Sequence, residues 1–309
     1  MQENKIKLIY IASNGRSGST LLDLLMGAHS NVWTLGEFQI LPWEIKTPRQ
    51  VCGCGKPVLE CDFWAAIIQN HKDILLNGTI HRFRHTHQFG RVIRWDEIPF
   101  FLVTHLKQSA TRERAIKDHG IQNAIVMRNV LEKAREHKGQ QVSWLVDASK
   151  DPYRLMWLYQ SGIFDIRVIH IVKEPRAFVY SMTKKDSGWL QIRKSVRMAG
   201  RYIVENYLID RVFAGTVRRH THWCNIRYED LARRPENTLQ MLCEWLRLPP
   251  DPDICSKFRG LQHGISGNDM RYKNTPIELD ENWKQNLPIL LQKVIYGMTF
   301  FSARKYGYH

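Results

Sequence analysis

The sequence predicts an α/β protein in three layers, with a central and mostly parallel sheet flanked by helices. Apolar segments of strand length alternate with amphipathic segments of helical length along the whole chain, and such alternation is typical of βαβ units. Two of the apolar segments lead directly into helix start signals, Asp151 with Pro152 and Glu174 with Pro175. A chain of 309 residues that is 43% hydrophobic can bury one full core. We therefore expect a single domain over residues 1–309.

Four segments are predicted strands because they are apolar, β-branched and short. They span residues 8–13, 142–146, 166–172 and 223–228. Helices are predicted at residues 19–29, 63–76, 122–137, 190–213, 235–246 and 287–306, and directly after Asp151 and Glu174. Residues 32–37 leave the first strand–helix unit and end in Gly36 and Glu37. The elements thus alternate in the order that a parallel sheet requires.

One long stretch departs from this alternation. Residues 40–120 contain no clear strand, and residues 78–111 are mixed in character with many His and Arg. We expect an inserted lobe here that covers the site, on the side of an acceptor molecule. The basic run at residues 79–94 is either a lid that faces an anionic or sugar-like acceptor or a solvated loop.

Charge and hydropathy restrict the partners. The formal net charge is +15, which indicates an anionic partner. The basic residues are spread along the chain, so a multiply charged nucleotide is favoured over nucleic acid. No apolar run reaches 18 residues, so we expect no membrane span. The polar start of the chain lacks a signal-peptide pattern, so we expect a cytoplasmic protein.

The most informative segment joins the first predicted strand to the first predicted helix. It is a turn of small and hydroxyl side chains with one cation inside it. Its members are Gly15, Arg16, Ser17, Gly18, Ser19 and Thr20. Backbone N–H groups at a helix start attract anions. The turn is not a Walker A loop, because no Lys follows Gly18. The sequence therefore predicts a phosphate-like ligand here, with close packing of small residues as the alternative.

This turn resembles the 5′-phosphosulfate loop of sulfotransferases that use 3′-phosphoadenosine-5′-phosphosulfate (PAPS), most of all the bacterial and carbohydrate-type members. The resemblance extends from Leu8 to about Trp283. It implies the P-loop-like fold and implies that residues 16–20 hold the 5′-phosphate and the bridging sulfate oxygens. PAPS would be the co-substrate, 3′,5′-bisphosphoadenosine (PAP) the product, and no metal would be needed for catalysis.

A second segment of the resemblance concerns the 3′-phosphate. In the family an Arg at the end of a strand and a Ser eight residues later grip this phosphate. Here Lys173 and Ser181 stand at that spacing. Lys keeps the charge but lacks the bidentate fork of Arg, and we expect Arg176 to supply it. A strand-end Lys in solvent is the alternative.

Two further segments resemble nucleotide-binding elements of the family. The run that contains Tyr228 follows a predicted strand, and the resemblance implies that its ring packs on adenine. The Gly-rich loop at residues 263–271 resembles the family's C-terminal nucleotide loop, with Arg271 and Asn268 as the expected ligands. A surface turn is the alternative for this loop.

The acid–base candidates come from two places. The resemblance to carbohydrate-type members implies that Glu37 takes the acceptor's proton, with His85 or His87 in the lobe as the rival bases. Arg16 and Lys150 are expected to stabilise the charge of the transferring and leaving groups. A Lys that merely starts a helix is the alternative for Lys150.

Three cysteines form a separate pattern. Cys52, Cys54 and Cys61 have the spacing C-x-C-x6-C. Three thiolates are compatible with zinc, and His71 is the candidate fourth ligand. A local structural role or a disulfide is the competing interpretation.

The combined interpretation is a sulfotransferase that moves a sulfuryl group from PAPS to a hydroxyl or amine of a small molecule, sugar or lipid. One alternative is a P-loop nucleotide kinase, with Asp147 as the magnesium-binding carboxylate. The other is a basic nucleic-acid-binding protein, although no helix-turn-helix or aromatic-basic strand pattern is present.

Overall fold

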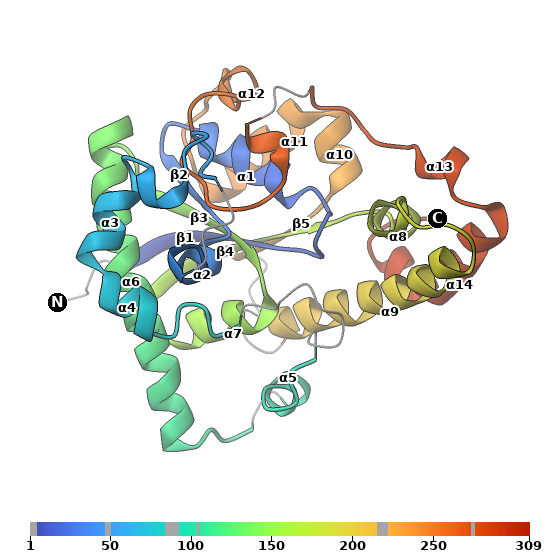
Figure 1. The fold of residues 1–309 in the computed structure, drawn as a ribbon, viewed down its shortest axis with the longest axis horizontal. Coiled ribbons are helices and arrows are strands. Elements are labelled where there is room, and N and C mark those ends of the chain that lie inside the picture. The colour runs from blue at the N-terminus through green and yellow to red at the C-terminus, as the bar shows by residue number, and fades with distance from the viewer. Residues whose placement is uncertain (1–4, 47–50, 84–92, 104–105, 215–221, 273–275) are drawn as a thin grey trace.

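The computed structural model describes residues 5–46, 51–83, 93–103, 106–214, 222–272 and 276–309 (Figure 1). Its centre is a sheet of five strands in the order β2-β3-β1-β4-β5, and every neighbouring pair is parallel. The strands are β1 (Ile6–Ala12), β2 (Val32–Gly36), β3 (Trp144–Lys150), β4 (Phe164–Val172) and β5 (Trp223–Arg227). The predicted α/β fold with a parallel sheet is confirmed.

Helices cover both faces of the sheet. The longer ones are α1 (Ser19–Ala28), α6 (Ala110–Lys138), α7 (Pro152–Gln160), α8 (Pro175–Thr183), α9 (Gly188–Val212), α11 (Pro235–Leu246) and α14 (Ile289–Lys305). The shorter ones are α2 (Leu41–Lys46), α3 (Trp64–Asn70), α4 (Lys72–Asn77), α5 (Ile98–Leu102), α10 (Tyr228–Arg233), α12 (Ile254–Lys257) and α13 (Trp283–Asn286). In Figure 1 the helices α1, α10, α11 and α12 lie above the sheet, α7 and α9 lie below it, and α6 runs along its left side.

The two faces follow from the alternation of side chains along the strands. In β1, Leu8 and Tyr10 belong to one buried cluster, which includes residues of α3, α6, α7 and α9. Ile9 and Ile11 belong to the other, which includes residues of α1, α11 and α12. Because both faces of β1 are buried, its sequence is a nearly continuous apolar run.

Strand β1 lies at the centre of the sheet. The chain adds β2 and β3 on one side of β1 and β4 and β5 on the other. At such a point in an open parallel sheet the following loops diverge and leave a crevice at the carboxyl ends of the strands. The loop after β1 therefore faces the loops that follow β2, β3 and β4.

Local sequence signals mark several helix ends. Asp151 accepts hydrogen bonds from the backbone N–H groups of Tyr153 and Arg154 at the start of α7. Glu174 likewise accepts from the N–H of Ala177 at the start of α8. Helix α11 has the predicted bounds, and it ends where Arg247 takes a left-handed backbone (φ 57°).

Three elements differ from the prediction. Residues 32–37 contain the edge strand β2 rather than an exit from the sheet. The predicted helix at 63–76 is two helices, α3 and α4, because His71 leaves the helical conformation (φ −123°, ψ 24°). Helix α6 begins at Ala110, twelve residues before the predicted start at 122. Its first turns are polar and exposed, so they lack the apolar periodicity on which the prediction relied.

The described residues of the 40–120 segment form short helices, and no strand lies among them. Helices α3 and α4 lie at the α6 side of the sheet (Figure 1), and none of the described residues from 40 to 120 lines the cavity described below. A role of this segment toward an acceptor stays a prediction. Across the described helices, none combines the length and the apolar character that a bilayer crossing needs.

Candidate active site

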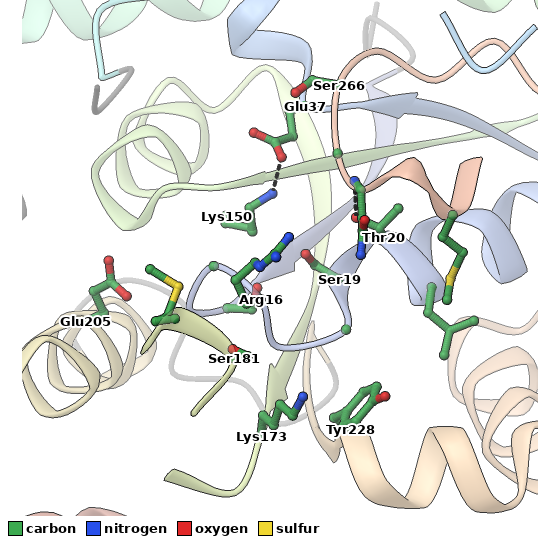
Figure 2. Close-up of a pocket in the computed structure, with 18 of the residues that line it drawn as sticks. Arg16, Ser19, Thr20, Glu37, Lys150, Lys173, Ser181, Glu205, Tyr228 and Ser266 are labelled. Carbon is green, nitrogen blue, oxygen red and sulfur yellow. Dashed lines mark hydrogen bonds and ion pairs between the residues drawn. The ribbon is translucent and has the colours of Figure 1, made fainter. Parts of the chain in front are cut away.

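A cavity of about 930 Å³ opens at the carboxyl edge of the sheet (Figure 2). Loops after β1, β2, β3 and β4 contribute to its wall, as the strand order requires. The predicted site residues that line it are Gly15, Arg16, Gly18, Ser19, Thr20, Glu37, Lys150, Lys173, Ser181, Tyr228 and Asn268. The tertiary structure therefore brings segments from six parts of the sequence to one place.

The loop after β1 is shaped by Gly18, which precedes α1. Gly18 has φ +87°, and no side chain caps the helix. A Cβ at Gly18 would lie 2.3 Å from Cδ2 of Tyr228, so only glycine fits there. Arg16 also takes a left-handed backbone (φ 71°). The turn thus leaves the first N–H groups of α1 open toward the cavity, where they attract an anion.

Two hydroxyl groups of this loop are buried without a partner among the described residues. They are the Oγ atoms of Ser13 and Ser17. Ser17 is fully buried and Ser13 nearly so. A buried hydroxyl that lacks a hydrogen bond is costly. Ser13 lines the cavity and Ser17 does not. A phosphate-like oxygen in the loop would relieve the cost at Ser13, so this cradle fits an anion.

A second cation lies across the cavity from the loop. Lys173 follows the end of β4 and is 6% exposed. Its Nζ lies 4.5 Å from the centre of the Tyr228 ring (Figure 2). Burial lowers the pKa of Lys173 from its ordinary value. Ser181 also lines the cavity, and its Oγ donates to the carbonyl of Phe178 at 2.7 Å. An anion that reached Lys173 would stabilise its charged form.

Glu37 and Lys150 form the third part of the site. The Nζ of Lys150 lies 2.6 Å from Oε1 of Glu37, with both side chains less than a fifth exposed. The same Nζ donates to the carbonyl of Ala148 at 3.0 Å. Glu37 follows β2 and Lys150 ends β3, where the chain adopts φ 66°. The adjacent ends of these strands thus place a carboxylate and an ammonium in one wall.

The Gly-rich loop at 263–271 closes the cavity above α1. The N–H of Asn268 donates to Oγ1 of Thr20 at 3.2 Å. Arg271 does not line the cavity; its Nη1 donates to the carbonyl of Gly264 at 2.9 Å. Burial lowers the pKa of Arg271. In this structure Arg271 therefore supports the loop from within, while Asn268 faces the cavity.

Arg176 lies outside the wall of the cavity. Its Nε contacts Oε1 of Glu174 at 2.5 Å, and its guanidinium lies over the rings of Trp283 and Tyr296. These contacts hold it against α13 and α14, away from Lys173. The rival bases His85 and His87 lie outside the described residues.

Sequence reasoning missed several charged residues of the wall. They are Lys184, Lys185, Lys194, Arg201 and Glu205. Three of them lie on α9, a helix whose surface charges carry no motif. Glu205 pairs with Arg201 at 2.8 Å and accepts from the amide of Asn14 at 2.7 Å. The sequence does not show that α9 packs beside the loop after β1, and this packing brings the three α9 residues into the wall.

Asp147 is not available to hold a metal ion. Its Oδ2 pairs with Nη2 of Arg154 at 2.9 Å, and both side chains are fully buried. Its Oδ1 accepts the N–H of Ser149. Asp147 does not line the cavity. The carboxylate is therefore a structural ion pair, which counts against a kinase that would use it to bind magnesium.

The three cysteines of the C-x-C-x6-C pattern come together away from the cavity. The histidine beside them is His263, not the predicted His71. His71 instead directs Nε2 to the side chain of Asn129, at 3.2 Å from its Oδ1.

No family model matches the chain, and no curated protein matches it either. Solved structures do match. The sulfotransferase domain from the curacin biosynthetic pathway is 17% identical, with a TM-score of 0.55 over 99% of this chain and 100% of that one. The sulfotransferase domain of the Synechococcus PCC 7002 olefin synthase is 17% identical, with a TM-score of 0.51 over 98% and 97%. The chain therefore has the fold of these sulfotransferase domains over nearly its full length.

Proposed function

We propose that this protein transfers a sulfuryl group from PAPS to a hydroxyl or amine of a small-molecule, sugar or lipid acceptor and releases PAP. The observation that carries the proposal is the pair of separate cationic sites in one cavity. Arg16 lies in the loop before α1, and Lys173 lies at the end of β4. Tyr228 contacts both the loop, at Gly18, and Lys173. A nucleotide with phosphates at two positions and a flat base suits a cavity lined by two cations and an aromatic ring.

The residues present fit such a nucleotide. The buried, unpartnered hydroxyls of Ser13 and Ser17 lie in the loop that would hold the 5′-phosphate. Lys173 and Ser181 would hold the 3′-phosphate, and the Tyr228 ring would pack on the base. PAPS, when bound, supplies a sulfuryl group on a good phosphate leaving group.

The chain's own residues would serve the transfer as follows. A bond forms between the acceptor oxygen or nitrogen and sulfur, while the bond from sulfur to the bridging phosphate oxygen breaks. The acceptor's proton moves to Glu37, the carboxylate that Lys150 orients. Arg16 and the N–H groups at the start of α1 stabilise the negative charge that develops on the leaving phosphate. Lys150 stabilises the charge on the transferring group.

The direct test is a thermal-shift titration with PAP, with AMP as the matched ligand that lacks the 3′-phosphate. A ligand at 100 times its Kd adds about 2.7 kcal/mol to the free energy of unfolding. AMP lacks the 3′-phosphate and should bind more weakly, so at equal concentration PAP should raise the melting temperature far more than AMP. Transfer of labelled sulfate from PAPS should then appear in a panel of acceptors. No shift with PAP, combined with magnesium-dependent ATP turnover, would reject the proposal in favour of a kinase.

A further inference from the structure

A cluster of three cysteines and one histidine lies outside the active-site cavity. Its members are Cys52, Cys54, Cys61 and His263. Each offers one ligand atom, and these four atoms all lie within 4.8 Å of one another. We propose that this cluster is a structural zinc site with three thiolate ligands and one imidazole ligand, Nδ1 of His263.

The distances between ligand atoms agree with tetrahedral zinc. With Zn–S bonds of about 2.3 Å, ligand atoms of a tetrahedron lie about 3.8 Å apart or slightly less. The Sγ of Cys61 lies 3.5 Å from that of Cys52 and 3.6 Å from that of Cys54. Nδ1 of His263 lies 3.2 Å from the Cys61 sulfur and 3.7 Å from the Cys52 sulfur. These separations also exceed a disulfide bond of about 2.05 Å.

The cluster lies in a dry part of the protein. Cys52 and Cys61 are fully buried, and His263 is 7% exposed. Water therefore has little access to the ligand atoms, as in closed structural zinc sites.

The imidazole is held in place by its neighbours. The His263 ring stacks on Phe63, with ring centres 5.2 Å apart, and on Trp33 at 6.0 Å. The indole N–H of Trp64 donates to the His263 carbonyl at 2.5 Å. The two stacked rings restrict the tilt of the imidazole, and the Trp64 bond holds the backbone that carries it. His263 is thus oriented toward the thiols from a distant part of the chain.

The site joins two segments that are far apart in sequence. The N–H of Gly53 donates to the carbonyl of Gly264 at 3.1 Å, and Cys52 forms a bridge with Ile265. The carbonyl of Ile265 in turn accepts the N–H of Glu37 at 2.7 Å. A metal here would therefore fix the base of the loop that carries Asn268 into the cavity. The assignment of the site does not depend on the reaction that the cavity performs.

The test is metal analysis of the purified full-length chain. We expect one equivalent of zinc per chain, and replacement by cobalt(II) should give thiolate charge-transfer bands and the strong visible bands of tetrahedral cobalt. Cys54→Ser and His263→Ala should lose most of the zinc. His71→Ala and Cys255→Ser are matched controls that should keep it. His263→Cys should retain the metal, since four thiolates also suit zinc.

Two results would overturn the proposal. One is wild-type protein that contains no stoichiometric zinc after expression with added zinc and that gives no tetrahedral cobalt spectrum. The other is full zinc content in both Cys54→Ser and His263→Ala. If a ligand variant fails to fold, the cobalt titration of the wild-type chain decides the question. In the first of these results, a disulfide found by mass spectrometry within the cluster of the protein as purified would identify the competing disulfide interpretation as the correct one.

Discussion

Lys150 holds Glu37 through a 2.6 Å ion pair at the carboxyl edge of the sheet (Figure 2). The pair joins the ends of β2 and β3, in the wall of the cavity that the loop between β1 and α1 also lines. A carboxylate oriented in this way suits proton removal from an acceptor. The neighbouring ammonium suits stabilisation of the group being transferred.

Replacement of Glu37 tests the role of the carboxylate. Glu37→Gln keeps the size of the side chain and removes the base, so turnover with PAPS should fall by roughly 10²- to 10⁴-fold. Affinity for PAP by calorimetry should change little. Glu132→Gln, on the exposed face of α6, is the control and should leave both unchanged. Near-normal turnover in Glu37→Gln would transfer the role to another base, such as His85 or His87.

Lys173 should determine affinity for a nucleotide with a 3′-phosphate. It is a nearly buried cation, and hydrogen bonds to charged groups contribute about 1.5–3 kcal/mol. Lys173→Ala should therefore weaken PAP binding by roughly 10- to 100-fold, with a much smaller effect on AMP. Calorimetry with both nucleotides measures the difference. Lys117→Ala, at an exposed position of α6, should bind like the wild type. If the affinities for PAP and AMP fall equally, Lys173 does not contact the 3′-phosphate.

Two glycine substitutions should have opposite effects. Gly18→Ala meets both a left-handed backbone (φ +87°) and the Tyr228 ring at 2.3 Å, so it should destabilise the chain and abolish PAP binding. Gly200→Ala lies within α9 with no atom within 4 Å of the new Cβ. It should stabilise the chain by roughly 0.5–1 kcal/mol. Chemical denaturation of the two variants gives the comparison. Wild-type stability in Gly18→Ala would mean that the loop relaxes away from Tyr228.

The raised pKa of Asp23 should make the free energy of unfolding fall as the pH rises toward 7. Burial raises the pKa of this carboxyl to about 7, although Oγ1 of Thr34 donates to it at 2.5 Å. Between the unfolded pKa of about 3.9 and the folded value, the native chain binds more protons than the unfolded chain. The Asp23 contribution to stability is therefore fully present below about pH 4 and is lost as the pH rises to about 7.

Asp23→Asn removes this proton uptake while keeping an acceptor for Thr34. The free energy of unfolding of the wild type, relative to the variant, should fall by about 1.4 kcal/mol per pH unit over that range. Urea denaturation of both proteins from pH 4 to pH 8 measures the difference. Parallel curves would mean that Asp23 is ionised in the folded chain throughout.

Local sequence signals were sufficient to predict helix ends that depend on residues adjacent in the chain. Proline at the first helical position set the start of α11, and Asp151 capped α7 as expected. The edge strand β2 gave no such signal. At α6 the cap is present, because Ser109 accepts the N–H of Arg112, but the polar first turns lack the apolar periodicity that would have extended the predicted helix to it. The apolar run at residues 63–76 has helical periodicity, yet it breaks at His71, which lies close enough to contact Asn129 of α6. Tertiary packing decided those elements.

The sequence by itself determined the strand–turn–helix around Gly18, the cation at the end of β4 and the alternation that produces a parallel sheet. These features depend on residue types that lie next to one another along the chain. The tertiary structure alone decided that Lys150 meets Glu37, 113 residues away, and that His263 meets Cys61 at a separation of 202 residues. Strand order and register bring such partners together, and neither is written in the spacing of the residues themselves. The same packing turned Arg176 toward α13 and α14 and away from the cavity.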